Sequence, residues 1–166
     1  MPTAFETLTA LVTPTDGRGE IDWTTYESLL GFQARAGVSG VLVGGTTGES
    51  PTLTTNELER SIEIAMDRLP STVEVVAATG RNRLDETLEL TAFAADHGVK
   101  SVLLVDPYYN GPSSVEIRRE HLEPVCDRFP EIGIIPYVIP SRTGTRLEPR
   151  DIARLLGDGR RIVAVK

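Results

Sequence analysis

Short apolar runs alternate with longer amphipathic segments along the chain. The runs are rich in β-branched residues and lack an alternation of apolar and polar positions. Strands that are buried on both faces of a parallel sheet have this pattern. The pattern predicts six strands, at Leu8–Val12, Gly40–Val43, Val73–Ala77, Ser101–Val105, Gly133–Val138 and Ile162–Val165.

The segments between these runs have the apolar spacing of helices that cover a sheet on one face. Asp22 is placed to cap the first helix and Gly37 to end it. From Gly40 onward the strands recur about every 30 residues, the spacing of βα units in an eight-stranded barrel. Five helices are predicted, at Trp23–Ala36, Asn56–Arg68, Leu84–His97, Ser114–Phe129 and Pro149–Leu156.

Two architectures suit this order of elements. An open doubly wound sheet accommodates six strands, whereas a closed barrel needs eight strands and typically ~250 residues. The run Ile162–Val165 brings the chain to Lys166 with no helix after it, and a native domain rarely ends on an uncovered apolar parallel strand. We therefore expect residues 1–166 to form the N-terminal part of a single α/β domain, about the first six strands of a (β/α)8 barrel.

Charge and composition narrow the classes of partner. The 166 residues include 17 Lys and Arg against 24 Asp and Glu, a net charge of -7, which disfavours nucleic acid and anionic membranes as partners. No apolar run approaches the ~20 residues of a membrane helix, and the start of the chain does not resemble a signal peptide, so we expect a cytoplasmic protein. One cysteine, Cys126, allows no multi-cysteine zinc site.

The two histidines lie away from the strand ends. His97 is placed to cap carbonyls in the last turn of a helix, and His121 is expected on a helix surface. This placement argues against a histidine metal site or a Ser-His triad, so no metal is expected.

Side chains with useful chemistry follow the C-terminal ends of the predicted strands. In a parallel barrel these ends share one rim, where active sites are built. The side chains in question are Thr46, Thr47, Glu49, Ser50, Thr79, Asn82, Asp106, Tyr108, Tyr109, Asn110, Tyr137, Ser141, Arg142 and Lys166.

Lys166 offers the most specific chemistry of this set. Partial desolvation at the end of an apolar strand would lower the pKa of its amine, and a neutral amine attacks carbonyls to form a Schiff base. A lysine that simply emerges into solvent is the commoner case, so spacing alone does not decide. Three of the four tyrosines also lie on the predicted rim, where a phenol relays protons or packs under loops.

Two further segments suggest anion binding. The turn Gly44–Ser50 combines two threonine hydroxyls with backbone N–H groups that could hold a carboxylate or a phosphate, although a plain strand-to-helix turn is a fair alternative. It lacks the Gly-Lys-Ser/Thr ending of a P-loop. Arg142 offers a two-pronged grip on a carboxylate, or is simply exposed.

Five segments in order carry a resemblance to a known family. They are Ala10-Leu11-Val12-Thr13-Pro14, Gly37-Val38-Ser39-Gly40, Gly45-Thr46-Thr47-Gly48-Glu49-Ser50, Asp106-Pro107-Tyr108-Tyr109-Asn110 and Tyr137 to Gly144. Together they resemble the pyruvate-dependent class I aldolases of the dihydrodipicolinate synthase and N-acetylneuraminate lyase family. The resemblance implies an enzyme that condenses pyruvate with an aldehyde and needs no cofactor.

The resemblance also implies catalytic roles. Lys166 looks like the lysine that condenses with the pyruvate ketone, and Tyr137 like the hydroxyl that shuttles protons. Thr46 and Tyr109 look like the other members of the hydroxyl relay, with Tyr109 reaching into a neighbouring subunit. The family is typically tetrameric, so we expect a homotetramer built from tight dimers.

Substrate binding follows from the same resemblance. Gly45 and Thr47 look like the part of the turn that holds the pyruvate carboxylate, and Arg142 like the residue that receives the carboxylate of the second substrate. Arg142 favours the synthase branch, whose second substrate is aspartate semialdehyde. Val138 stands where the synthases commonly have Asn, so an aldolase of 2-keto-3-deoxy sugar acids or an N-acetylneuraminate lyase-like enzyme is an alternative. A non-catalytic member that binds keto acids is another.

A candidate effector site completes the resemblance. Asn82, Glu86 and Tyr108 match the lysine-inhibition site of the synthases. Thr55 and Leu58 stand where some members carry histidines, which weighs against feedback control by lysine.

Overall fold

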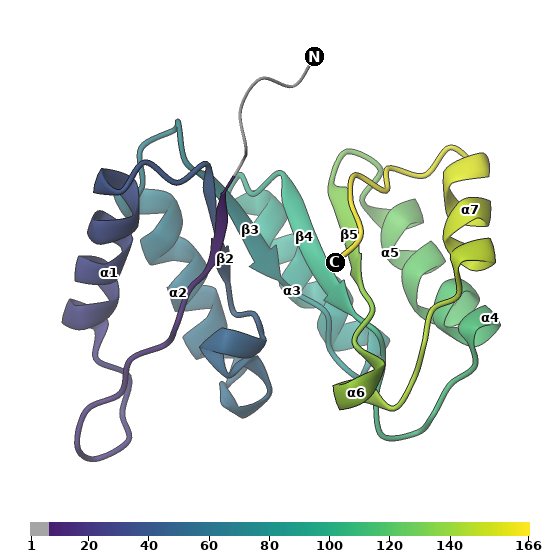
Figure 1. Cartoon of the computed structure of the whole chain (residues 1–166), viewed down its shortest axis with the longest axis horizontal. Coiled ribbons are helices and arrows are strands. Elements are labelled where there is room, and N and C mark those ends of the chain that lie inside the picture. The colour runs from purple at the N-terminus through teal and green to yellow at the C-terminus, as the bar shows by residue number, and fades with distance from the viewer. Residues whose placement is uncertain (1–6) are drawn as a thin grey trace. The chain divides into compact units, whose positions relative to one another are not determined.

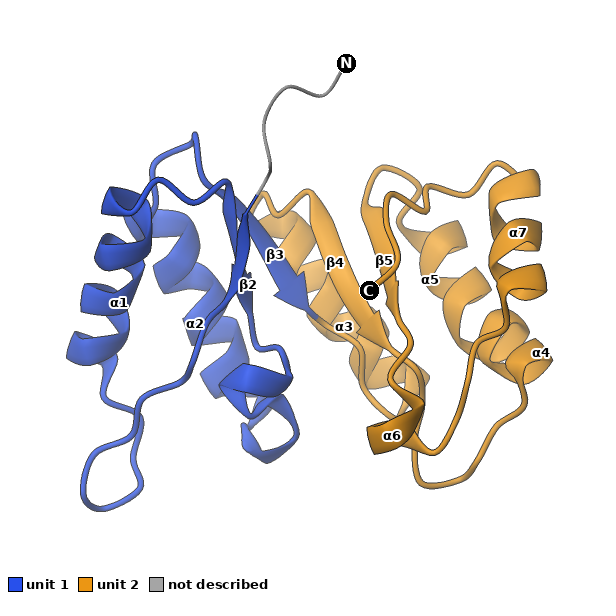
Figure 2. Cartoon of the chain, viewed as in Figure 1, with its two compact units in different colours: residues 1–78 blue, residues 79–166 orange. Residues whose placement is uncertain are grey.

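The structure is a computed structural model that describes residues 7–166. The chain divides into two compact units, of which unit 1 ends at Ala78 and unit 2 runs from Thr79 to Lys166 (Figures 1 and 2). Within residues 7–166 there are five strands, which alternate with helices as the sequence pattern predicts.

Unit 1 contains three strands that pair in parallel and in chain order. They are β1 (Leu8–Ala10), β2 (Gly40–Val43) and β3 (Glu74–Ala78). The predicted bounds of β2 are confirmed, whereas β1 ends two residues early. The N–H of Leu11 still donates to the carbonyl of Leu42 at 3.0 Å, so the pairing continues just past the strand.

The two helices of unit 1 are α1 (Trp23–Arg35) and α2 (Thr55–Arg68). Asp22 caps α1 as predicted, because its carboxylate accepts the N–H of Thr25 at 3.0 Å. The buried Tyr26 ties α1 to α2, since its hydroxyl donates to the carbonyl of Ser61 at 3.2 Å.

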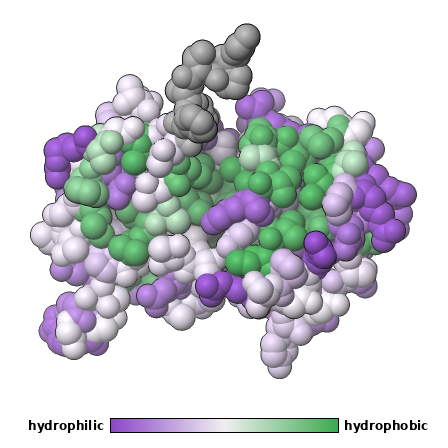
Figure 3. Space-filling model, in the orientation of Figure 1, coloured by the Kyte–Doolittle hydropathy of each residue, from purple (hydrophilic) through white to green (hydrophobic). Residues whose placement is uncertain are grey.

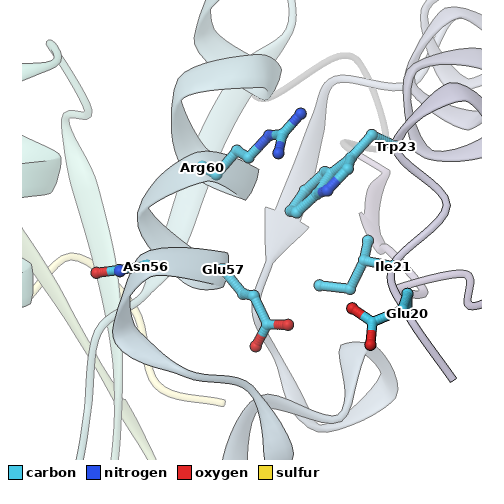
Figure 4. A pocket seen from close by; sticks show the side chains of 6 residues that line it. All are labelled: Glu20, Ile21, Trp23, Asn56, Glu57 and Arg60. Carbon is cyan, nitrogen blue, oxygen red and sulfur yellow. The ribbon is translucent and has the colours of Figure 1, made fainter.

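A cavity of about 270 Å³ lies at the N-terminal ends of α1 and α2 (Figure 4). The Arg60 guanidinium stacks over the Trp23 ring with its carbon 4.4 Å from the ring centroid. Below them, Glu57 accepts both the N–H and the hydroxyl of Thr54, each at 2.7 Å, in a capping box. Two polar side chains of this cavity are therefore already engaged. Glu57 caps the start of α2, and Arg60 contacts Trp23 of α1.

Unit 2 contains the parallel pair β4 (Ser101–Val105) and β5 (Gly133–Tyr137). Its helices are α3 (Leu84–Asp96), α4 (Ser114–Glu116), α5 (Glu123–Arg128), α6 (Pro140–Thr143) and α7 (Pro149–Gly157). The predicted helix over 114–129 is interrupted, because its middle is the π-helical segment η3 (Ile117–Leu122). The short helix α6 was not predicted.

The expected sixth strand at Ile162–Val165 is wrong as a strand assignment. Only one isolated parallel bridge, Ile134 to Ile162, is present there. The segment nevertheless lies beside β5, because the N–H of Val163 donates to Ile134 at 3.0 Å and that of Lys166 to Pro136 at 2.9 Å. Its valines are about half exposed, and Figure 3 shows apolar side chains gathered on this part of unit 2.

Candidate active site

The turn after β2 is shaped by a glycine. Gly44 has φ +67°, which strains any residue with a Cβ, and a Cβ there would lie 2.5 Å from Cδ2 of Leu58, so that side chain would have to shift. The chain then forms two short helical turns, η1 (Thr46–Gly48) and η2 (Ser50–Thr52). Gly45 is buried ahead of η1, Thr46 is half-buried and Thr47 is exposed.

Three of the seven N–H groups of the turn Gly44–Ser50 are engaged within it. Gly48 and Ser50 donate to the carbonyl of Gly45 at 3.0 and 3.4 Å, and Glu49 donates to Thr46 at 3.1 Å. Among residues 7–166, the N–H groups of Thr46 and Thr47 have no backbone partner, as is usual in the first turn of a helix. The turn therefore offers fewer N–H groups to an anion than predicted, and those of Thr46 and Thr47 remain available.

Lys166 and Tyr137 meet at the end of β5. The Lys166 Nζ lies 4.3 Å from the centroid of the Tyr137 ring, and Tyr137 is buried. The backbone sets this pairing, because Lys166 donates to Pro136 and accepts the N–H of Val138, both at 2.9 Å. The expected desolvation of Lys166 is not found, since its side chain is exposed in the described chain.

Two other predicted site residues point to solvent. Tyr109 is 93% exposed and has φ +73°, a left-handed conformation that is uncommon for a residue with a Cβ. Arg142 is exposed in α6, a single turn that Gly144 closes by donating to Pro140 at 3.0 Å. Both side chains are therefore available to a ligand or to another chain.

The candidate effector residues are brought together in part. Asn82 Oδ1 accepts the N–H of Tyr108 at 2.8 Å, which fixes the loop after β4 to the loop before α3. Glu86 faces Arg83 instead, with 3.6 Å between its carboxylate and the guanidinium. Of the predicted residues, those of the turn after β2 (Gly45, Thr46, Thr47, Glu49 and Ser50) belong to unit 1 and the others to unit 2.

Asp106 directly follows β4, and the sequence did not indicate its role. Its side chain is 1% exposed, and one carboxylate oxygen accepts the N–H of Leu147 at 3.1 Å. Its other oxygen has no partner among residues 7–166. Burial raises the pKa of Asp106 to about 6. The Asp106 carboxylate and the Thr145 hydroxyl, which donates to the carbonyl of Pro107 at 2.9 Å, together hold the chain after Arg142 against the end of β4.

The raised pKa of Asp106 predicts a pH-dependent stability. The folded chain holds this proton up to about pH 6, whereas the unfolded chain releases it near pH 3.8. Folding therefore takes up a proton between these values, and the free energy of unfolding falls as the pH rises through about 6. Relative to Asp106→Asn, which keeps an acceptor for Leu147, the unmodified chain should lose up to about 3 kcal/mol between pH 4 and pH 7.5.

Urea unfolding at a series of pH values measures this difference. Asp96→Asn, which changes an exposed aspartate at the end of α3, is the matched control and should track the unmodified chain. A pH slope that is the same for the unmodified chain and for Asp106→Asn would contradict the assignment.

No helix within residues 7–166 is long and apolar enough to cross a membrane. Over the same residues, no three His, Cys, Asp or Glu side chains are grouped so that they could hold a metal ion.

Comparison with curated proteins places this geometry in a family. Residues 4–166 match the model of the dihydrodipicolinate synthetase family. The chain is 42% identical over 148 residues to the 4-hydroxy-tetrahydrodipicolinate synthase of Syntrophobacter fumaroxidans, a match that covers 89% of this chain and 50% of that protein. It is 41% identical over 157 residues to the synthase of Methanococcus maripaludis, with 95% and 53% covered. The chain spans about half the length of these relatives.

Solved structures agree with the sequence comparison. The dihydrodipicolinate synthase from Aquifex aeolicus matches with a TM-score of 0.91 and 39% identity, over 97% of this chain and 54% of that one. The chloride-inhibited dihydrodipicolinate synthase from Acinetobacter baumannii, solved in complex with pyruvate, matches with a TM-score of 0.91 and 32% identity, over 97% and 54%. The prediction of a partial (β/α)8 barrel is confirmed, and the chain belongs to the dihydrodipicolinate synthetase family.

Proposed function

We propose that the protein condenses pyruvate, held as a Schiff base on Lys166, with aspartate semialdehyde. The observation that carries this proposal is the position of the Lys166 amine over the Tyr137 ring, 4.3 Å from its centroid, at the end of β5. An amine beside a phenol has the two groups that imine formation requires, a nucleophile and a proton carrier.

The chemistry proceeds in steps that these groups support. The Lys166 amine, in its neutral form, attacks the ketone carbon of pyruvate, and protons delivered through Tyr137 let the resulting carbinolamine lose its hydroxyl group as water to give the imine. The imine withdraws electrons, so the pyruvate methyl group loses a proton and becomes an enamine carbon. That carbon attacks the aldehyde carbon, and the aldehyde oxygen takes up a proton. Thr46 and Tyr109 are proposed to complete the hydroxyl relay.

The two substrate carboxylates need separate partners. We assign the pyruvate carboxylate to Gly45 and Thr47, because the turn after β2 keeps the N–H groups of Gly45, Thr46 and Thr47 out of its internal hydrogen bonds. We assign the second carboxylate to the exposed Arg142, whose guanidinium binds carboxylates with two parallel hydrogen bonds. The exposure of Tyr109 fits a contact with another copy of the chain, so a homotetramer is part of the proposal, as is a cytoplasmic location.

Borohydride trapping tests the Schiff base directly. With pyruvate present, reduction of the full-length protein should leave a stable carboxyethyl group on Lys166, found by peptide mass spectrometry. The sequence described here contains two lysines, so Lys100, exposed before β4, is an internal control that should stay unmodified. Lys166→Arg should abolish the adduct and Lys100→Arg should keep it. An adduct on Lys100, or none at all, would refute the mechanism.

An aldehyde competition separates the proposed reaction from its alternatives. Turnover of pyruvate with aspartate semialdehyde, and none with the aldehydes that give 2-keto-3-deoxy sugar acids, is expected. The reverse preference would favour a sugar-acid aldolase, and adduct formation without turnover of either aldehyde would favour a non-catalytic keto-acid-binding protein.

A further inference from the structure

Unit 2 buries several polar side-chain atoms that have no hydrogen-bond partner among residues 7–166. They include Asp106 Oδ1, Arg118 Nη2 and His121 Nε2, in residues that are 1%, 5% and 3% exposed. The burial of His121 corrects the expectation of a surface histidine. Arg118 and His121 lie in η3. Asp106 directly follows β4 instead, and its N–H donates to the carbonyl of Tyr137 at 3.3 Å, so it borders the proposed site.

Asp106 contacts both ends of the segment that carries Arg142. The bond from the Asp106 N–H to Tyr137 holds the end of β5, where this segment begins. The Asp106 carboxylate accepts the N–H of Leu147 at 3.1 Å, after the chain has turned back through α6. Figure 1 shows α6 at the end of β5 and the chain passing from it toward α7. Residues 138–146 thus form a loop, the Arg142 loop, whose two ends are fixed to one residue.

Hydroxyl groups hold the Arg142 loop between these two ends. Thr145 donates to the carbonyl of Pro107 at 2.9 Å. The Thr143 hydroxyl lies 3.1 Å from the carbonyl oxygens of both Ile139 and Thr145. Both threonines are buried, whereas Arg142 is exposed and forms no ion pair within residues 7–166. The position of the Arg142 guanidinium therefore depends on the backbone of the loop.

We propose that Asp106 is a positioning residue, which sets where Arg142 meets the carboxylate of the aldehyde substrate. This role rests on the proposed condensation. With its return fixed to Asp106, the Arg142 loop presents the guanidinium in few positions, so little freedom is lost when the second carboxylate binds. Replacing the Asp106 side chain leaves the backbone bond to Tyr137 in place. The groups that act on pyruvate are therefore unaffected, and only the second substrate should bind more weakly.

Steady-state kinetics of the full-length protein test this role. Asp106→Ala should raise the KM for aspartate semialdehyde about fivefold or more, because the N–H of Leu147 loses its acceptor, and should keep the KM for pyruvate within about twofold. Asp106→Asn retains a carbonyl oxygen for Leu147, so its KM for the aldehyde should stay within about twofold of the unmodified protein. Thr145→Val removes the bond to Pro107 and should raise the same KM about threefold, which keeps the test decisive even if Asp106→Ala fails to fold.

A double-mutant cycle shows whether Asp106 acts through Arg142. Arg142→Ala should raise the KM for the aldehyde about tenfold or more, because it removes a bidentate partner of the carboxylate. Adding Asp106→Ala to this variant should raise the KM no further, since the side chain that Asp106 positions is then absent. A merely structural role would multiply the KM by the same factor in both backgrounds.

Hydrogen exchange measures the anchoring of the loop without the reaction. The peptide that spans residues 138–148 should exchange faster in Asp106→Ala, and at the original rate in Asp106→Asn and in the exposed control Asp96→Asn. Unchanged exchange in Asp106→Ala, an unchanged KM for the aldehyde, or an equal rise of this KM in the Arg142→Ala background would each overturn the positioning role and leave the condensation intact. Absence of turnover in the unmodified protein would instead refute the condensation, and this role with it.

Discussion

Asp151→Ala should lower the melting temperature of the protein by roughly 10 °C, because it strips a buried arginine of its main partner. Arg118 and Asp151 are 5% and 1% exposed, and Arg118 Nε lies 2.8 Å from Asp151 Oδ1. The hydrogen bond to Asp151 raises the pKa of Arg118. Without that bond the guanidinium still stays charged, because arginine is effectively always protonated in proteins. Glu123 also pairs with Arg118 but is itself more exposed, so it compensates only in part.

The double variant Arg118→Met/Asp151→Leu distinguishes pairing from simple packing. Because both charges are then absent and the volume is roughly kept, most of the lost melting temperature should return. Differential scanning calorimetry of the single and double variants measures the effect. If the double variant melts no higher than Asp151→Ala, the loss comes from packing or from the Ser114 hydroxyl, which donates to Asp151 at 2.6 Å, and the pairing argument fails.

Gly80→Ala should reduce the free energy of unfolding by about 3 kcal/mol or more, since there is no room for a methyl group. A Cβ at Gly80 would lie 2.5 Å from the Val105 nitrogen and 2.9 Å from the Leu104 Cα, which are backbone atoms of β4. The N–H groups of Thr79 and Gly80 hold the chain at this distance by donating to Leu103 at 3.2 and 3.3 Å. Relief would require β4 itself to move.

Gly157→Ala is the matched control for this substitution. Gly157 lies at the end of α7, and its Cβ would meet no atom within 4 Å. Alanine there should leave stability unchanged or raise it by up to about 1 kcal/mol, because alanine favours the helix. Urea unfolding of both variants measures the contrast, and equal stabilities would show that the approach to β4 is looser than described.

The regular elements were predictable because each has a local signal. The strands β2 and β4 have the predicted bounds, since their apolar runs end sharply at residues that leave the sheet. Short turns such as η1 and α6 have too few residues to show a helical period. The apolar side chains near the end of segment 162–166 predict a strand. The backbone of this segment does hydrogen-bond to β5, but it forms only one isolated bridge, and side-chain hydropathy does not indicate the extent of such pairing.

Part of the candidate site's geometry followed from the expected strand ends. The structure brings Lys166 and Tyr137 together, and their catalytic roles stay predictions. His121 and Arg118 were unpredictable, because charged neighbours in sequence suggest a solvated helix face. Arg118 is buried against a carboxylate 33 residues away, a pairing that no local pattern indicates.

The π-helical segment η3 changes how this helix must be aligned with its counterparts. A π turn takes in about one more residue than an α turn over a similar rise, so inward positions before and after it are out of phase by one. Against a relative whose helix is α-helical throughout, an alignment that runs straight through residues 114–128 would pair the buried Val125 and Cys126 with water-facing positions. In that case a one-residue gap inside Ile117–Leu122 would restore the shared inward face.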